Sequence, residues 1–214
     1  MTRWLTTRPR QTGCSNSVAE EPWLVIADAS VAINLNATGR AMEILRALPF
    51  RVAVTDIVEA ELREDRRSGR QDAALLAELV EAQRVRIVSL NDAALSVFGE
   101  LVAGAAAETL DDGEAATIAY AVTHDAVPVI DERKARRICH QRFGGLHVLS
   151  TVELVMQPAV ETALGRDALA DAVFQALQSA RMRVLPEYVG WVIALIGIDR
   201  ALQCPSLPRG ARFR

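Results

Sequence analysis

Four acidic residues stand where an expected strand passes into a helix, and they come from distant parts of the chain: Asp28, Glu61, Glu114 and Asp131. Because such junctions of a parallel α/β domain share one edge of the sheet, we expect the four side chains to meet there. Carboxylates that are brought together repel one another unless a cation compensates their charge. Mg²⁺ prefers oxygen ligands and retains waters, so a few carboxylates without a histidine or cysteine cage suit it. The sequence therefore predicts a hard-metal site.

The first two acidic residues also have interpretations that involve no metal. Asp28 follows a short apolar run and can be a turn residue or a helix cap. Ser30 can cap the next helix, or it can fix the Asp28 carboxylate by a hydrogen bond. Glu61 shares the apolar face of its helix with Ile57 and Val58, which predicts an inward-pointing carboxylate. Such a carboxylate is bound to a metal or paired with an arginine, unless the expected helix start is misplaced by one residue. Of these alternatives we favour the metal.

The other two acidic residues have structural interpretations as well. The run Asp111-Asp112-Gly113-Glu114 fits a capping box, in which Asp111 is the N-cap and Glu114 reaches back to its amide. The positive end of the helix would keep these carboxylates ionised at neutral pH. Asp131 ends a strand and, taken alone, is a helix cap.

Two groups of basic residues near these acids are candidates for contacts with a nucleic-acid backbone. Such runs are usually a solvated helix face, so this interpretation depends on the acidic site beside them. The groups are Arg133, Lys134 and Arg137 after Asp131, and Arg63, Arg66 and Arg67 after Glu61.

The composition agrees with a globular protein of a reducing cytoplasm. Half of the 214 residues are hydrophobic and the net charge is −3, so any binding of nucleic acid must be local. The three cysteines and three histidines lack metal-ligand spacing and predict neither a disulfide framework nor a zinc site. We expect no signal peptide in residues 1–21, which lack an apolar stretch. We expect no membrane segment either, because the most apolar run, residues 188–198, is too short to span a bilayer.

The elements that must position the acids alternate between strand and helix up to residue 150. Apolar runs predict strands at residues 23–27, 51–54, 85–90, 127–130 and 146–150, with helical spacing between them. This alternation predicts a three-layer α/β/α domain with a mostly parallel sheet of about five strands. Helices at 152–164, 167–180 and 187–198 follow. We therefore expect a flexible tail over 1–21, the α/β domain over 22–150, a helical C-terminal extension over 151–200 and a tail over 201–214.

Four motifs, in this order and spacing, resemble the PIN-domain family. They are Leu-Val-Ile-Ala-Asp-Ala-Ser-Val at 24–31, Val-Thr-Asp-Ile-Val-Glu-Ala-Glu-Leu at 54–62, Asp-Asp-Gly-Glu-Ala-Ala-Thr at 111–117 and Val-Ile-Asp-Glu-Arg at 129–133. The likeness covers about residues 23–150 and is greatest to a VapC-like branch with Gly-Glu-Ala in its third motif. It implies a PIN-like fold for the α/β domain.

The resemblance also implies a Mg²⁺-dependent ribonuclease, with Mn²⁺ as an alternative metal. Ser30 matches the small hydroxyl residue that supports the first acid of the family. The fourth motif departs from the commoner Thr-x-Asp form, which leaves Glu132 as an alternative to Asp131, and Asp111 or Asp112 can share the third role. The catalytic and metal-binding acids of the family correspond to Asp28, Glu61, Glu114 and Asp131.

The expected function is metal-assisted hydrolysis of RNA phosphodiesters by the toxin of a toxin–antitoxin pair, with an antitoxin protein as the partner. The apolar tail helices can serve a homodimer or antitoxin docking, although core packing is the better interpretation. The alternative function is a catalytically silent PIN-like scaffold that binds a protein or RNA. A receiver or dehalogenase-like domain is disfavoured, because Asp28 has no acidic neighbour and Ser30 stands where the dehalogenase pattern needs aspartate.

Overall fold

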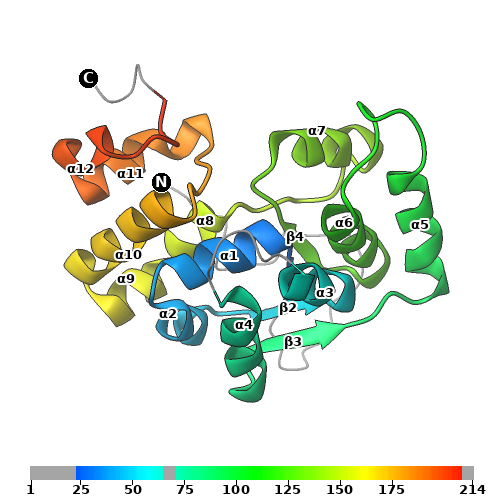
Figure 1. The fold of residues 1–214 in the computed structure, drawn as a ribbon, viewed down its shortest axis with the longest axis horizontal. Helices are drawn as coiled ribbons and strands as arrows, with labels where there is room; N and C mark the ends of the chain where they lie inside the picture. Colours follow the sequence, from blue (N-terminus) through cyan, green and yellow to red (C-terminus); the bar gives the residue numbers. More distant parts are fainter. Residues whose placement is uncertain (1–22, 65–70, 209–214) are drawn as a thin grey trace, which may run out of the picture.

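The computed structural model describes residues 23–64 and 71–208, and within them the sheet has four strands, all parallel (Figure 1). The strand order is β3-β2-β1-β4. Strands β2 and β3 are added on one side of β1, and β4 pairs with the other side of β1. A crevice forms at such a switch point, outside the carboxyl ends of the two strands. The strands are β1 (Leu24–Ala27), β2 (Arg51–Thr55), β3 (Val85–Val88) and β4 (Val127–Val129).

The prediction of a fifth strand at residues 146–150 is wrong. This segment meets β4 in one isolated bridge, between Val129 and Leu149. The chain leaves the sheet directly afterwards, because Ser150 is the N-cap of the next helix and forms a complete capping box with Glu153. The guanidinium of Arg136 also binds the carbonyl oxygens of residues 130, 148 and 149, which fixes the segment without a ladder.

Helices cover both faces of the sheet, which confirms the predicted α/β class. Alternate residues of a strand point to opposite faces. Val25 and Val52 pack in one core with the N-terminal helices, whereas Ile26 and Ala53 pack on the other face against Tyr120. The helices up to residue 142 are α1 (Ala29–Ala37), α2 (Ala41–Ala47), α3 (Asp56–Glu64), α4 (Asp72–Glu81), α5 (Asp92–Val102), α6 (Asp112–His124) and α7 (Arg133–Arg142).

The remaining helices lie on the side that Figure 1 shows in yellow to red. The first of them pack on α1 and α2, and the last ones pack on the helices before them. Val173 and Leu177 belong to the same buried cluster as Val31 and Leu35 of α1. The apolar residues of these helices therefore pack in the core. The elements are α8 (Thr151–Val155), α9 (Pro158–Leu164), α10 (Arg166–Ser179), the 3₁₀ turn η1 (Pro186–Tyr188), α11 (Val189–Ile196) and α12 (Ile198–Leu202).

Two of the expected C-terminal helices are divided, and both divisions have a local cause. Pro158 is the first residue of α9 and lacks the amide hydrogen that would continue α8. Gly197 has a φ of 84°, which glycine adopts readily, and it separates α11 from α12. Among the described residues, no helix is both long and apolar enough to cross a bilayer.

Candidate functional site

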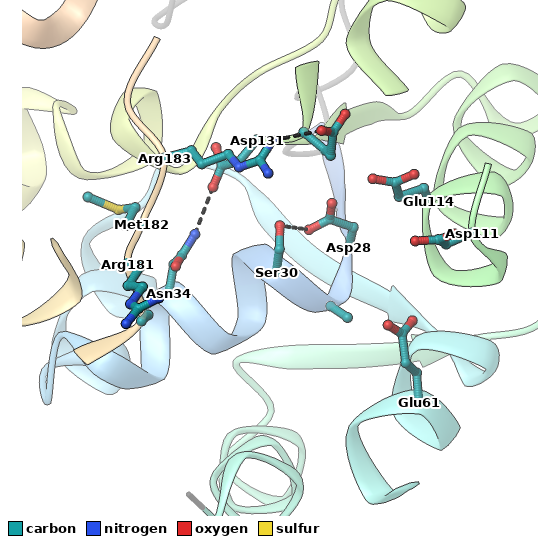
Figure 2. Close-up of a pocket in the computed structure, with 13 residues that line it drawn as sticks. Asp28, Ser30, Asn34, Glu61, Asp111, Glu114, Asp131, Arg181, Met182 and Arg183 are labelled. Carbon is teal, nitrogen blue, oxygen red and sulfur yellow. Dashed lines mark hydrogen bonds and ion pairs between the residues drawn. The ribbon is translucent and has the colours of Figure 1, made fainter. Parts of the chain in front are cut away.

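A polar pocket of about 260 Å³ opens at the switch point of the sheet. All four predicted acids line it, together with Asp111 and Glu132. Figure 2 shows the carboxylates of Glu114 and Asp111 pointing toward Asp28, with Glu61 facing them from α3. The structure therefore brings together side chains that lie far apart in the sequence, from position 28 to position 132.

Asp28 lies at the base of the pocket and is only 2% exposed. It follows β1 directly and is the N-cap of α1, because its Oδ1 accepts a hydrogen bond from the Val31 amide at 2.8 Å. Ser30 donates its hydroxyl to the same oxygen at 2.9 Å, so Ser30 supports the carboxylate and does not cap the helix. Burial, followed by the charges of Asp131 and Glu114, raises the pKa of Asp28 to about 8.

Asp131 is also buried, at 3% exposure, and both of its oxygens are held by hydrogen bonds. Its Oδ1 accepts from the Thr151 amide and its Oδ2 accepts from Asn34 Nδ2, both at 2.8 Å, and the Thr151 hydroxyl also donates to Oδ2. Burial raises the pKa of Asp131 even though these bonds favour the charged form. Asp131 is not the cap of α7, because that role belongs to Glu132. It joins α1, β4 and α8 instead.

Glu114 is half-buried in the first turn of α6, and burial together with the charges of Asp111 and Glu132 raises its pKa to about 7. Only half of the expected capping box is formed. Glu114 accepts a hydrogen bond from the Asp111 amide, but the Asp111 side chain makes no capping bond and faces the pocket. Asp112 does not line this pocket. It lines a neighbouring one with Glu61 and Asp111.

The prediction that Glu61 points inward with the apolar residues of its helix is wrong, because Glu61 is exposed. The buried residues of α3 are Val58 and Leu62, and Glu61 lies beside this stripe at the rim of the pocket. Its carboxylate reaches across Gly113 of α6, where a Cβ atom would lie 2.3 Å from Glu61 Oε2. Glycine at position 113 therefore leaves the space that the Glu61 carboxylate occupies.

Glu132 stands at the edge of the pocket and caps α7 through the amides of Lys134 and Ala135. Its Oε1 accepts from Arg183 Nη1 at 2.7 Å. Partial burial acts to raise the pKa of Glu132, but the Arg183 hydrogen bond and the two amides lower it on balance. Glu132 is thus an ionised acid that ties the pocket to the C-terminal helices.

The predicted RNA-binding residues lie outside the pocket. Arg133 and Arg137 are exposed on α7, and Arg137 donates to the Ala107 carbonyl at 3.1 Å. Lys134 is near enough for its charge to lower the pKa of Glu114. In the second group, Arg63 forms an ion pair with Glu59 at 2.6 Å. Arg66 and Arg67 lie outside the described residues.

Sequence reasoning missed several residues of the pocket. Asn34 has a recognisable signal, since it is a polar residue among the mostly apolar buried residues of α1. Arg181, Met182 and Arg183 line the pocket from the segment after α10, and no motif in the sequence pointed to them. Figure 2 shows them opposite the acidic residues of α3 and α6.

The donor set fits a hard divalent cation. The charged groups that line the pocket are six carboxylates and two guanidiniums, with Ser30 and Asn34 as further oxygen donors. The raised pKa of the buried Asp28 shows that this site disfavours uncompensated negative charge. Among the described residues, no three acidic, histidine or cysteine side chains enclose an ion by themselves. Mg²⁺ does not require such a cage, because it usually binds one or two carboxylates and keeps several waters.

Comparison with known proteins identifies the family of the chain. A search of curated proteins finds no match. A family model described as a PIN domain matches residues 24–197, and PIN domains are typically nucleases. The match includes all four strands, the acidic pocket and the helices through α11. The chain therefore belongs to the PIN-domain family.

Proposed function

We propose that the protein is a Mg²⁺-dependent endoribonuclease that hydrolyses RNA phosphodiesters, with Mn²⁺ as an alternative metal. The observation that carries this proposal is the meeting of Asp28, Glu114 and Asp131 in one pocket at the switch point of the sheet. Carboxylates that are buried together are either protonated or compensated by a cation, and a bound metal ion supplies that compensation. The family supports a nuclease in general, and the acidic pocket supports the metal dependence.

The residues that would hold the ion come from several elements. Asp28 follows β1 directly and Asp131 lies two residues after β4. Glu114 and Glu61 approach from α6 and α3. Ser30 fixes the Asp28 carboxylate, which limits the rotation that would weaken a ligand. When bound, a divalent cation would stabilise the charge on the phosphate and lower the pKa of a water molecule for attack.

Cleavage of a labelled single-stranded RNA tests this proposal directly. We expect the wild-type protein to cleave in Mg²⁺ and to be inactive with a chelator. Asp28→Asn keeps an acceptor for the Val31 amide but removes the charge, so the rate should fall on the order of 100-fold or more.

Asp92→Asn is the matched control, because Asp92 is an exposed acid in the first turn of α5 and does not line the pocket. Its rate should equal that of the wild type. Cleavage by Asp28→Asn at the wild-type rate would refute the proposal. A wild-type protein that folds and binds RNA without cleaving it would instead be the non-catalytic scaffold.

We also propose that this nuclease is the toxin of a toxin–antitoxin pair and acts in the cytoplasm. The proposal rests on the VapC-like form of the motifs, since a free ribonuclease would harm its host. The two described cysteines, Cys139 and Cys204, are buried and form no disulfide with each other, which agrees with a reducing compartment. Expression should arrest growth of a host cell, and Asp28→Asn should not.

A further inference from the structure

One wall of the acidic pocket comes from the far end of the chain. Ala180, Arg181, Met182 and Arg183 follow α10 and line the pocket together with Asp28 and Glu114. The two walls differ in charge, because the α3 and α6 side carries carboxylates and the segment after α10 carries two guanidiniums. Figure 2 shows this arrangement, with Arg183 reaching from its ribbon toward the acidic side chains.

The position of this segment is fixed by the core. Met182 is 2% exposed and packs in the large hydrophobic cluster, and its amide donates to the Ala176 carbonyl at 3.2 Å. Arg183 is 58% exposed and forms its ion pair with Glu132 at 2.7 Å. A buried methionine between two exposed arginines therefore holds both charges at the pocket.

The backbone at Arg181 is unusual for an arginine. Its φ is 54°, in the left-handed region, directly after the end of α10. Glycine is the common residue at such a helix end, and any other L-residue costs roughly 1 kcal/mol there. The structure thus keeps a charged side chain at the pocket in a conformation that glycine would adopt with less strain.

An RNA phosphate needs positive charge on this side of the pocket. The six lining carboxylates repel an incoming anion, and the predicted basic residues Arg133 and Arg137 do not line the pocket. Arg183 uses Nη1 for its ion pair with Glu132, and a guanidinium carries five N–H donors. It can therefore contact a phosphate without releasing Glu132.

We propose that Arg181 and Arg183 bind the backbone phosphate next to the one that is cut, so that the C-terminal helices complete the substrate site. This inference rests on the proposed ribonuclease function. The planar fork of arginine suits the paired oxygens of a phosphate and gives strong charge-assisted hydrogen bonds. The acidic wall then holds the cation and the arginine wall holds the RNA.

Three variants and a matched control test this inference. Arg181→Gly removes the charge and relieves the left-handed strain, so a loss of activity in a variant with the thermal stability of the wild type comes from the lost side chain. Arg183→Gln removes the charge, and Arg183→Lys keeps it without the fork. The control is Arg166→Gln, which removes an exposed arginine of α10 that pairs with Glu161 and does not line the pocket.

The readouts are KM and kcat for RNA cleavage in Mg²⁺ and the affinity for RNA in Ca²⁺, measured by fluorescence anisotropy over a range of salt. We expect Arg181→Gly and Arg183→Gln each to raise KM and Kd roughly tenfold, because each removes a charge-assisted hydrogen bond to the phosphate. The slope of log K against log salt should fall by about 0.7 for each phosphate that the variant no longer binds. Arg183→Lys should be intermediate, and Arg166→Gln should match the wild type.

The failure of this inference differs from the failure of the proposed function. If the wild type cleaves RNA and both Arg181→Gly and Arg183→Gln match Arg166→Gln, the proposed role of the two arginines in RNA binding is refuted. The proposed nuclease function is then unaffected. Faster cleavage by Arg183→Gln would also refute it, because the arginine would then restrain the site. A wild type that neither cleaves nor binds RNA in Mg²⁺ would refute the proposed function itself.

Discussion

At the scale of single residues, Asp28 combines the roles that its sequence position left open. Its Oδ1 caps α1 and accepts the Ser30 hydroxyl, while the residue also lines the acidic pocket. The cap is therefore no alternative to the metal-binding interpretation, because it orients the carboxylate. Burial and the charge of Asp131 disfavour the ionised form of Asp28.

The metal-free protein should lose stability as the pH rises. The pKa of Asp28 is raised from 3.8 to about 8, so between these values the folded state holds a proton that the unfolded state has lost. The free energy of unfolding must therefore fall as the pH rises through this range. Urea unfolding with a chelator should show a shallower decline for Asp28→Asn than for the wild type and Asp92→Asn. Equal declines in all three proteins would contradict the assignment.

Gly113→Ala should separate stability from activity. Its new Cβ would lie 2.3 Å from Glu61 Oε2, and the end of an exposed side chain can move away with little strain. Alanine favours a helix over glycine by roughly 0.5–1 kcal/mol, so the fold should be unchanged or stabilised. Because the Glu61 carboxylate would be displaced from the rim, cleavage should fall several-fold.

Gly99→Ala in α5 is the control for this substitution, because a Cβ there meets nothing within 4 Å. It should give a similar change in thermal stability and no change in cleavage. Full activity in a folded Gly113→Ala protein would show that the position of Glu61 is unimportant.

At the scale of elements, the sequence predicts the strands that precede the acidic residues better than it predicts helix orientations and strand ends. Asp28 and Asp131 could be placed because each follows a short apolar strand of a parallel sheet. The predicted orientation of Glu61 was wrong. Glu61 is the neighbour of the buried Leu62 in the sequence, and one residue along a helix turns a side chain from the buried face to the rim of the pocket. The prediction of a fifth strand was wrong because Ser150 caps the next helix and ends the extended segment. An apolar run alone does not reveal that a helix cap competes with strand pairing.

The contact between Asp131 and α8 predicts a loss of stability in Thr151→Val. The valine keeps the shape and the backbone amide bond but removes the hydroxyl that donates to Asp131. Losing this buried bond should cost about 1–2 kcal/mol in the free energy of unfolding, measured in urea. Thr162→Val removes an exposed hydroxyl bonded to the Pro158 carbonyl and should change stability by less than about 0.5 kcal/mol. Equal effects would mean that the Asp131 link adds no stability.

At the scale of the whole molecule, the C-terminal helices belong with the sheet. Their apolar residues share one buried cluster with α1 and β1, and the family match extends to residue 197. The helices themselves could be predicted from periodicity. The return of the chain to the pocket at Arg183 could not, because it depends on long-range packing of α10 against α1 that no local pattern specifies.

A chain that ends at residue 150 should therefore not fold. It would expose Val31 and Leu35 to water and would lose the Thr151 bonds to Asp131. We expect no cooperative thermal transition by circular dichroism, whereas the full-length protein should show one. A sharp transition in the shorter chain would show that residues 22–150 form an independent domain.

The most direct test of the account is whether a divalent cation displaces a proton from the pocket. Because the pKa of Asp28 is about 8, this carboxyl is mostly protonated at pH 7 without metal. Calorimetric titration with Mn²⁺ in two buffers of different ionisation enthalpy counts the protons released. Glu114, with a pKa of about 7, releases protons as well, so the account predicts binding with proton release that is smaller in Asp28→Asn than in the wild type. Absence of binding, or equal proton release by Asp28→Asn, would contradict it.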